Sequence, residues 1–518
     1  MQRNRVMVIG AGIGGLTTAL LLAGRGFDVT LVEKEAAAGG KVRRVPVGDT
    51  AVDGGPTVFT LRPVFDAIFA EVGERLDDHV RLTRPAVLAR HAWSTDERLD
   101  LYPDPAQSEA AIGDFAGAAA ASGFRDFAAA AARVYRILED SFLENSRCYP
   151  PELMRRIGLW RIGDLIAIRP YESLWKVLGE YFADPRLRQL FGRYTTYCGS
   201  SPFKAPATLM LIAHAEARGV WLIDGGMSAL AGALEGVARR LGVRFRYDAA
   251  VVDILTDRGR ASGVTLASGE RLDADWLVCN ADPQALATGR LGAAGTRAVR
   301  AYPAKRRSLS AFTWLLSGRA EGLPLATHNV FFSRDYPAEF ADLAKGRVPA
   351  DPSVYLCALD RGADGAAGAP HERFQIIVNA PADGDRHSYT SEEIERCSRQ
   401  MRARLSHCGI ELVPDTPPAV VTPTDFEALF PSTGGALYGR ASHGWAASFL
   451  RQSARTRIPG LYCTGGSTHP GAGVPMAALS GRLAAATLMQ DRLSTVRSVR
   501  GAMPGGMSTR SPTTAASG

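Results

Sequence analysis

Residues 6–33, VMVIGAGIGGLTTALLLAGRGFDVTLVE, decide the fold of this chain. An apolar run at 6–9 predicts a strand, and glycines at positions 10, 12 and 15 follow it with the spacing GxGxxG. Apolar residues spaced along 16–22 predict a helix, and residues 28–32 predict a second strand. A strand, a glycine turn, a helix and a second strand in this order predict a dinucleotide-binding βαβ unit.

The chemistry of this unit follows from its glycines and one acid. A Cβ at Gly12 would block the approach of a pyrophosphate, and the helix N-terminus supplies free N–H groups and a partial positive charge. Glu33 ends the second strand, where its carboxylate can accept hydrogen bonds from both ribose hydroxyls of an adenosine. The acid also disfavours a 2′-phosphate, so we expect NAD or FAD rather than NADP. A buried βαβ unit that holds no ligand is the alternative.

Further glycine turns indicate a cofactor longer than NAD. GGK at 39–41 and DGGPT at 53–57 follow closely, whereas a simple NAD domain would continue into another helix. Near the other end of the chain, CTGGSTHPGAGVPMAALSGRLAAA at 463–486 combines an apolar strand end, a glycine-rich turn and a helix. An extended cofactor, with a ring system far from its adenine, would use these additional backbone donors.

The spacing from Gly10 to Glu33, followed by Gly39-Gly40-Lys41, resembles the flavoprotein signature of the amine oxidase and phytoene desaturase superfamily. The resemblance implies FAD as cofactor and a C-terminal glycine loop that holds the flavin's ribityl chain and pyrimidine edge. It also implies that Val252 offers its backbone to the adenine edge. The expected cofactor-binding residues are Gly10, Gly12, Gly14, Gly15, Glu33, Lys34, Gly40, Lys41, Pro56, Thr57, Val252, Gly465, Gly466, Gly473, Val474 and Pro475.

The expected fold class is α/β: a two-domain FAD-dependent oxidoreductase with a discontinuous Rossmann-type dinucleotide-binding domain and a mixed α+β substrate domain. A length of 518 residues with 46% hydrophobic residues suits a large globular enzyme of more than one domain. The expected segments are a first FAD-binding segment at 1–95, a helical substrate- or membrane-facing segment at 96–215, a second FAD-binding segment at 216–300, a mixed substrate-domain segment at 301–455, a C-terminal FAD-binding segment at 456–494 and a disordered tail at 495–518.

Cysteine and histidine spacing favours a reducing cytoplasm and argues against a metal site. The seven cysteines, Cys148 among them, form no CxxC pair, and the nine histidines show neither HxxxH nor HExxH spacing. No uncharged apolar run of about 18 residues occurs, so we expect no transmembrane helix. The first strand begins at once, which leaves no room for a signal peptide.

A net charge of +7 calls for an anionic partner or surface. The basic residues are dispersed and no nucleic-acid motif occurs, so we expect no nucleic-acid partner. Residues 154–177, MRRIGLWRIGDLIAIRPYESLWKV, interleave arginines with tryptophans and aliphatic residues, as interfacial helices do. The alternative is a solvated helix packed on its own domain. The first interpretation predicts a cytoplasmic protein held peripherally at the inner or photosynthetic membrane.

Several longer motifs resemble carotenoid desaturases related to phytoene desaturase. They are GGM at 225–227, YCGSSPFKAPA at 197–207, DFEALFPSTGGALYG at 425–439 and THPGAGVP at 468–475. Within that family, ARGVWLIDGGM at 217–227, TWLLSGRA from 313 and NVFFSRDYPAEF from 329 look most like the 1-hydroxycarotenoid 3,4-desaturases of purple phototrophic bacteria. The resemblance covers the chain to about residue 490 and implies a hydrophobic carotenoid substrate.

The implied reaction removes two hydrogens from adjacent carbons of a polyene. The flavin takes a hydride, and the delocalised cation that remains is acidic at the neighbouring carbon, so little side-chain base is required. No catalytic base is therefore assigned. The polar candidates near the ring are Asp425 and His469, with Thr57 and Thr468 beside them, and His469 in its THPGAG loop is more typical of a loop-fixing residue. Oxygen and a quinone both stay open as electron acceptor.

Rival functions share some features of this pattern. A phytoene desaturase or a carotenoid isomerase would carry the same motifs. A flavin amine oxidase would need an aromatic pair that frames the flavin, for which Trp445 and Tyr438 are the nearby candidates. A lipid carrier of the Rab escort type, with no enzymatic activity, would have lost the flavin contacts that Glu33 and Gly40 represent.

Overall fold

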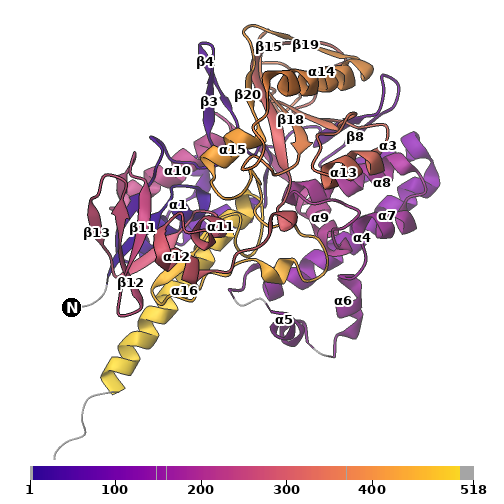
Figure 1. Cartoon of the computed structure of the whole chain (residues 1–518). Helices are drawn as coiled ribbons and strands as arrows, with labels where there is room; N and C mark the ends of the chain where they lie inside the picture. Colours follow the sequence, from indigo (N-terminus) through magenta and orange to yellow (C-terminus); the bar gives the residue numbers. More distant parts are fainter. Residues whose placement is uncertain (1–3, 147–148, 159, 369, 502–518) are drawn as a thin grey trace, which may run out of the picture.

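The computed structural model describes residues 4–146, 149–158, 160–368 and 370–501, with the backbone alone from 495 to 501 (Figure 1). Cys148 and residues 502–518 of the expected tail lie outside these ranges. The chain forms a parallel sheet, a larger mixed sheet and a helical layer, which confirms the α/β class (Figure 1).

The parallel sheet is assembled from segments far apart in the sequence. Its central strand, β1, pairs in parallel with β2 on one side and β14 on the other. The strand order is β10 (Arg244–Arg246), β2 (Asp28–Val32), β1 (Arg5–Ile9), β14 (Trp276–Cys279) and β21 (Leu461–Cys463). The expected discontinuous Rossmann-type domain is therefore present. In such sheets, ligands bind beyond the carboxyl ends of the strands.

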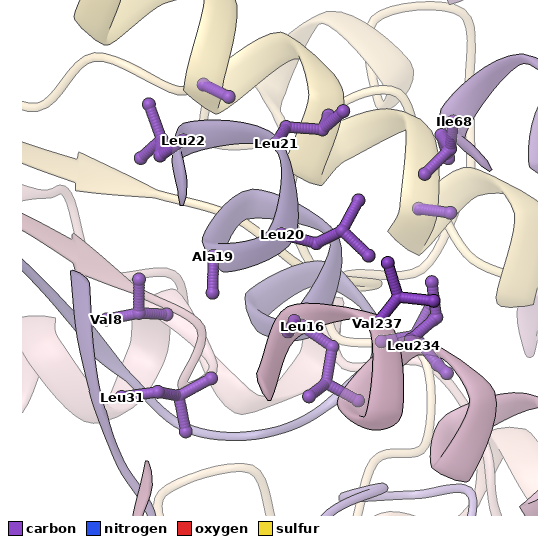
Figure 2. Close-up of a cluster of buried hydrophobic side chains, with 14 of the residues drawn as sticks. Val8, Leu16, Ala19, Leu20, Leu21, Leu22, Leu31, Ile68, Leu234 and Val237 are labelled. Carbon is purple, nitrogen blue, oxygen red and sulfur yellow. The ribbon is translucent and has the colours of Figure 1, made fainter. Parts of the chain in front are cut away.

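The helix after β1 is buried on every side. All residues of α1 (Ile13–Gly24) from Ile13 to Leu22 are buried. Figure 2 shows the reason: Leu16 and Ala19 face Val8 and Leu31 of the sheet, while Leu234 and Val237 of α10 (Met227–Arg240) close another side. Because partners surround it, α1 has no polar stripe.

A third partner of α1 is α16 (Val474–Gly501), which lies along it (Figure 1). A Cβ on Gly481 would meet Gly14 O at 2.5 Å, so only glycine permits this approach. The Thr18 hydroxyl lies 2.8 Å from Gly14 O and 3.1 Å from Gly481 O, as a donor shared between the helices. The tail expected from residue 495 begins inside this helix, which continues to Gly501.

Smaller elements complete the side of the molecule that carries the parallel sheet. An antiparallel sheet contains β11 (Val251–Asp257), β12 (Arg260–Leu266) and β13 (Arg271–Asp273). Around it and the parallel sheet lie β3 (Arg44–Val47), β4 (Thr50–Asp53), β5 (Phe59–Thr60), β6 (Leu82–Thr83), β9 (Val220–Ile223), α2 (Arg62–Ala70), η1 (Leu76–Asp78), α11 (Pro283–Ala287), α12 (Gly292–Ala298) and η5 (Ala304–Arg306).

The larger sheet forms one wall of the interior. Its order is β19 (Ile410–Pro414), β15 (Ser310–Gly322), β18 (Glu372–Ala380), β17 (Val354–Ala358), β16 (His328–Phe331), β7 (Ala89–Ala92) and β8 (Arg98–Leu101), with β20 (Ala419–Val421) on β15. Along β18, Phe374, Ile376 and Val378 pack in the core that includes residues of α14 (Ser391–His407). The alternate residues face the other way, because side chains of a strand alternate between its two faces.

The helical layer lies between residues 105 and 217. Its elements are α3 (Pro105–Ala116), α4 (Ala118–Leu138), η2 (Glu139–Leu143), α5 (Pro150–Ile157), α6 (Ile162–Ala167), α7 (Leu174–Tyr181), α8 (Pro185–Gly192), η3 (Arg193–Cys198), η4 (Ala207–Met210) and α9 (Leu211–Ala217). Three helices and a turn, α13 (Tyr336–Ala344), α14, α15 (Pro423–Leu429) and η6 (Ser448–Leu450), follow later in the chain. The expected boundary between the first FAD-binding segment and the helical segment, at residue 95, falls inside a hairpin. Its two strands, β7 and β8, both belong to the larger sheet, so the boundary was wrong in this respect.

The sequence predicts neither a transmembrane helix nor a metal site, and the structure bears on both only for the residues that it describes. No helix among them has the length and apolarity needed to cross a bilayer. No group of His, Cys, Asp and Glu within those ranges could hold a metal ion, and the six cysteines described there are buried free thiols.

Gly481→Ala should force α16 away from α1. Its Cβ would lie 2.5 Å from Gly14 O and 2.8 Å from Thr17 Cβ. Overpacking of this kind costs about 1–3 kcal/mol of unfolding free energy. We expect a lower thermal midpoint than that of the wild type, measured by thermal unfolding.

Gly232→Ala in α10 is the matched control, because nothing lies within 4 Å of its added Cβ. Its midpoint should be unchanged or higher, since alanine favours a helix over glycine. Equal midpoints for both variants would contradict the close-packing argument.

Candidate functional site

A cavity of about 1060 Å³ lies between the two sheets. One side carries the carboxyl ends of β1 and β2, and the other carries residues of β15, β16, β17 and β18. From β18, the alternate residues Gln375, Ile377 and Asn379 line it. The volume is at the upper end of the usual range for ligand pockets. The site therefore suits a large, extended ligand.

The first glycine loop forms one end of this cavity. Gly10, Gly12 and Gly14 all line it, and Gly10 has the positive φ of +99° that a side chain would strain. A Cβ on Gly12 would meet Asn280 Nδ2 at 2.7 Å. Gly15 does not line the cavity: its added Cβ would lie 2.0 Å from Gly10 O. Gly15 thus permits the helix to pack on its own strand, and its contact with the cofactor stays a prediction.

Glu33 is positioned by two backbone donors. It is buried, and its Oε2 accepts a hydrogen bond from Ala11 N at 2.6 Å, while Oε1 accepts one from Glu35 N at 3.0 Å. Each carboxylate oxygen keeps a further lone pair for a hydroxyl donor in the cavity. Lys34 also lines the cavity, and its Nζ pairs with Glu35 at 3.0 Å.

The second glycine loop meets the first across the cavity. Its expected residues, Gly465, Gly466, Gly473, Val474 and Pro475, all line the cavity. Thr468 does not line it but anchors the loop, because its hydroxyl contacts Gly465 O at 2.6 Å and Ser480 Oγ at 2.5 Å. Since α1 begins at Ile13 and α16 at Val474, two helix N-termini face the same cavity and favour negative charge there.

Lys41 is the cation of the GGK turn and lines the same cavity. Its ammonium donates a hydrogen bond to Leu437 O and lies 5.1 Å from the centre of the Phe430 ring. Burial lowers the pKa of Lys41 to about 8, against the opposing effect of the Asp282 carboxylate. Gly40, Pro56 and Thr57 line the cavity beside it, as expected.

Two buried polar atoms on the cavity wall fit a ligand rich in hydroxyl and ring N–H groups. Asp282 caps α11 by accepting from Gln284 N at 2.8 Å, and its Oδ2 is buried without a hydrogen-bond partner. Gln375 donates to Gly55 O at 2.9 Å, and its Oε1 is likewise buried and unpaired. An unsatisfied buried acceptor costs free energy, so a donor from the ligand stabilises each. With the glycine loops and Glu33, these residues fit FAD.

The inner wall carries polar residues that the sequence motifs did not reveal. The Thr57 hydroxyl contacts the Tyr355 hydroxyl at 2.6 Å, and His328 Nδ1 lies 2.8 Å from the same oxygen. Arg193 and Glu216, from η3 and α9, also line the cavity. Thr57 ends the DGGPT turn, but the other four residues belong to no local sequence motif, and only the fold brings them to it.

Three expected site residues do not line the cavity. Val251 lines the cavity, whereas the Val252 side chain is 46% exposed beside a β-bulge between Val251 and Asp253. The expected contact of the Val252 backbone with the adenine stays a prediction. Asp425 is an exposed helix-capping residue whose Oδ2 accepts from Thr422 N and Oγ1 at 2.8 and 2.7 Å. His469 lines a separate surface hollow, and its Nε2 lies 3.1 Å from Phe142 O. Neither candidate meets the large cavity.

Comparison with known proteins agrees with this geometry. The family model for flavin containing amine oxidoreductases matches residues 13–489. A hydroxyneurosporene desaturase of Rubrivivax gelatinosus is 50% identical and covers 99% of this chain and 98% of that protein. A hydroxyneurosporene desaturase of Cereibacter sphaeroides is 44% identical over 95% of this chain and 99% of that protein. An oxidoreductase structure from Methanosarcina mazei, 15% identical, superposes with a TM-score of 0.59 over 94% of this chain and 100% of that chain, which supports the fold alone.

Glu33→Gln should weaken FAD binding. The amide can accept from only one of the two backbone donors that Glu33 now satisfies, and it removes the charge that a ribose hydroxyl would meet. A hydrogen bond to a charged group contributes about 1.5–3 kcal/mol to the free energy of binding. Its loss should therefore raise the Kd for FAD by about 10- to 100-fold. Fluorescence titration of FAD-depleted protein measures it.

Asp28→Asn, at the opposite end of β2, controls for the loss of a carboxylate. Asp28 pairs with Arg244 at 2.6 Å on the surface, outside the cavity. An equal loss of affinity in this variant would refute the assignment of Glu33.

The charge of Lys41 should make stability depend on pH. Its pKa is about 8 in the folded FAD-free protein, against the ordinary lysine value of 10.5, so folding is opposed while the amine is charged. The penalty is full below pH 8 and disappears between about pH 8 and 10.5. The thermal midpoint of the wild type, minus that of Lys41→Met, should therefore rise over this window.

Exposed Lys345, changed to Met, is the control for removing a lysine. The difference in thermal midpoint between the wild type and Lys345→Met should stay constant between about pH 8 and 10.5. If the difference in thermal midpoint between the wild type and Lys41→Met were also constant over this pH range, the prediction would be overturned.

Proposed function

We propose that this chain, which belongs to the flavin-containing amine oxidoreductase family and within it to the carotenoid desaturases, introduces a C3–C4 double bond into acyclic 1-hydroxy- or 1-methoxycarotenoids. The observation that carries the proposal is one cavity with two regions. Its glycine loops and Glu33 suit a dinucleotide, and its other wall includes Ile212, Val330 and Ile377, which suit a polyene. Hydroxyneurosporene desaturases are the relatives at 50% and 44% identity.

FAD would lie between the two glycine loops. Glu33 would accept from the adenosine ribose, the N-termini of α1 and α16 would face the pyrophosphate, and Asp282 Oδ2 would accept from a cofactor hydroxyl. When bound, the flavin supplies a two-electron acceptor for the hydrogen that leaves the substrate with its electron pair.

The chain itself contributes position and the exclusion of water. The apolar wall, with Ile212, Val330 and Ile377, would hold the polyene beside the cofactor. The second hydrogen leaves as a proton from a carbon next to a delocalised cation, so no strong base is required. Asp425 and His469 lie outside the cavity and take no part in that step.

An exposed apolar surface suits delivery of the substrate from lipid. Eight of the ten large hydrophobic side chains exposed in the described residues gather in 149–171 and 445–450. We call them the apolar rim: Tyr149, Met154, Trp160, Ile162, Ile166, Tyr171, Trp445 and Leu450. Tyr171 and Trp445 link its two segments, with ring centroids 5.7 Å apart. Trp445 therefore belongs to the surface and forms no aromatic pair with Tyr438, which lines the cavity.

The arginines of the rim are held in ion pairs. Arg155 and Arg156 lie 2.7 and 2.8 Å from Glu152, and Arg161 lies 2.5 Å from Asp164. Arg169 pairs with Glu180 at 2.6 Å. Attachment to a membrane would thus depend on insertion of apolar side chains more than on attraction to anionic lipid. This geometry supports peripheral attachment at the inner or photosynthetic membrane, where oxygen or a quinone would reoxidise the flavin.

The substrate assay uses purified protein with FAD and liposomes that carry 1-hydroxyneurosporene or, separately, phytoene. We expect the absorbance of the hydroxylated pigment alone to shift to the red by one conjugated double bond. A shift with phytoene instead would make the chain an early desaturase. No shift with either, despite bound flavin, would favour an isomerase or an amine oxidase.

The double variant Trp160→Asp/Ile166→Asp should lose liposome association by about tenfold or more, because two side chains, 84% and 69% exposed, would no longer insert. Sedimentation with neutral liposomes at low and high salt measures it, and salt should have little effect on the wild type. Leu493→Asp, at the distal end of α16, is the matched control with a side chain 63% exposed. Strong salt dependence, or equal loss in the control, would contradict the role of the rim.

A further inference from the structure

A buried charged cluster lies on the otherwise largely apolar wall of the cavity. Arg193 and Tyr197 come from η3 and Glu216 from α9, and all three line the cavity. Arg193 is 7% exposed and Glu216 is 4% exposed. Charged side chains are rarely buried unless they are paired or bind a ligand, so this cluster calls for an explanation.

Glu216 is oriented by two tyrosines. The Tyr194 hydroxyl donates to Oε1 at 2.5 Å, and the Tyr197 hydroxyl donates to Oε2 at 2.9 Å. A carboxylate offers about four acceptor positions, so each oxygen can accept one more hydrogen bond. The carboxylate is therefore fixed in place with acceptor capacity left over.

Arg193 lacks some of the acceptors that a buried guanidinium needs. It lies over the rings of Tyr197 and Tyr194, at 5.0 and 5.7 Å from their centroids. The guanidinium also forms a hydrogen bond with the Tyr197 side chain. Its Nε and Nη2, however, are buried without a hydrogen-bond partner among the residues that the structure describes. An unsatisfied charged donor is costly, so an acceptor oxygen from a ligand would stabilise it.

The cluster lies beside the wall that meets the cofactor. Tyr355 contacts Thr57 at 2.6 Å and His328 at 2.8 Å, and both Thr57 and Tyr355 line the same cavity as Arg193. The charge of Arg193 acts on His328. Burial is the larger cause, and the nearby Arg193 charge the smaller one, of a pKa of His328 lowered to about 4. A polar atom held by the cluster is thus close to the expected position of the flavin.

The proposed substrate carries one oxygen, on C1. A single carbon separates C1 from C3, so a group that holds this oxygen next to the cofactor also decides that the C3–C4 bond is presented. A hydroxyl can donate to Glu216 and accept from Arg193, whereas a methoxy oxygen can only accept. A hydrocarbon end would leave both charged groups unsatisfied.

We propose that Arg193 and Glu216 form the specificity site for the C1 oxygen of the substrate, with the hydroxyl donating to the Glu216 carboxylate and accepting from the Arg193 guanidinium. This inference rests on the proposed function and adds the residues that select the oxygenated end. A site built to hydrogen-bond a substrate hydroxyl discriminates strongly against the analogue that lacks it. The order of preference is hydroxyl, then methoxy, then hydrocarbon.

The test compares Arg193→Met with the wild type on 1-hydroxyneurosporene and on neurosporene, its hydrocarbon analogue, in the FAD-loaded full chain. We expect kcat/KM for the hydroxylated substrate to fall by about 10- to 100-fold, as for a lost hydrogen bond to a charged group. Activity on neurosporene should be unchanged or higher. Quenching of tryptophan fluorescence by each pigment gives the same comparison for Kd without turnover.

Arg188→Met is the matched control, because Arg188 stacks on Trp175 at 4.6 Å and lies outside the cavity. It should keep the wild-type preference. Should Arg193→Met fold poorly, the double variant Arg193→Met/Glu216→Gln removes both charges together and should show the same loss of preference. Thermal midpoints and bound flavin confirm folding.

Three results would overturn the inference. An equal fall with both pigments would make Arg193 a structural residue only. An unchanged preference in folded Arg193→Met would place recognition of the oxygen elsewhere. A wild type that converts neither pigment would refute the proposed function itself, and the inference with it, whereas the first two results leave the desaturase function standing.

Discussion

The close packing of α1 on α16 is the constraint on which the rest of the structure depends. Gly14 and Gly481 let the two helices touch, and the Thr18 hydroxyl is shared between their backbones. Because the helices begin beside the cavity, this contact brings two glycine loops from opposite ends of the chain to one site. Both partial positive charges then face the same volume, which suits the pyrophosphate of an extended dinucleotide.

The cavity combines this polar end with a wall built by strand alternation. On β18, one face packs Phe374, Ile376 and Val378 into the core, and the other presents Gln375, Ile377 and Asn379 to the cavity. A polyene needs such a wall, since it offers little besides apolar surface. The Arg193–Glu216 cluster interrupts the wall at one place, and a buried charge with donors left unpaired in the protein is stabilised by a polar atom of the ligand.

The surface shows why composition is a poor guide to partners. A net charge of +7 and the arginines of 154–177 predict attraction to an anionic surface. The structure instead pairs Arg155, Arg156 and Arg161 with nearby carboxylates and leaves Trp160 and Ile166 exposed. The exposed apolar area then distinguishes this face, because the carboxylates of Glu152 and Asp164 offset part of the positive charge and exposed ion pairs are screened at physiological salt.

The sequence by itself determined the βαβ unit, the position of Glu33 at the end of its second strand and the presence of both glycine loops, because these depend on spacing within a few residues and on backbone geometry that only glycine allows. It also located the strands at 6–9 and 28–32 to within one residue of their bounds. Only the tertiary structure decided that Val251 rather than Val252 faces the cavity, that Asp425 caps a helix and that His469 lies outside the site. It alone brought Arg193 and Glu216 to one cavity, with Tyr197 in contact with both, and Thr57 to Tyr355, since contacts between distant segments follow from packing that no local pattern encodes.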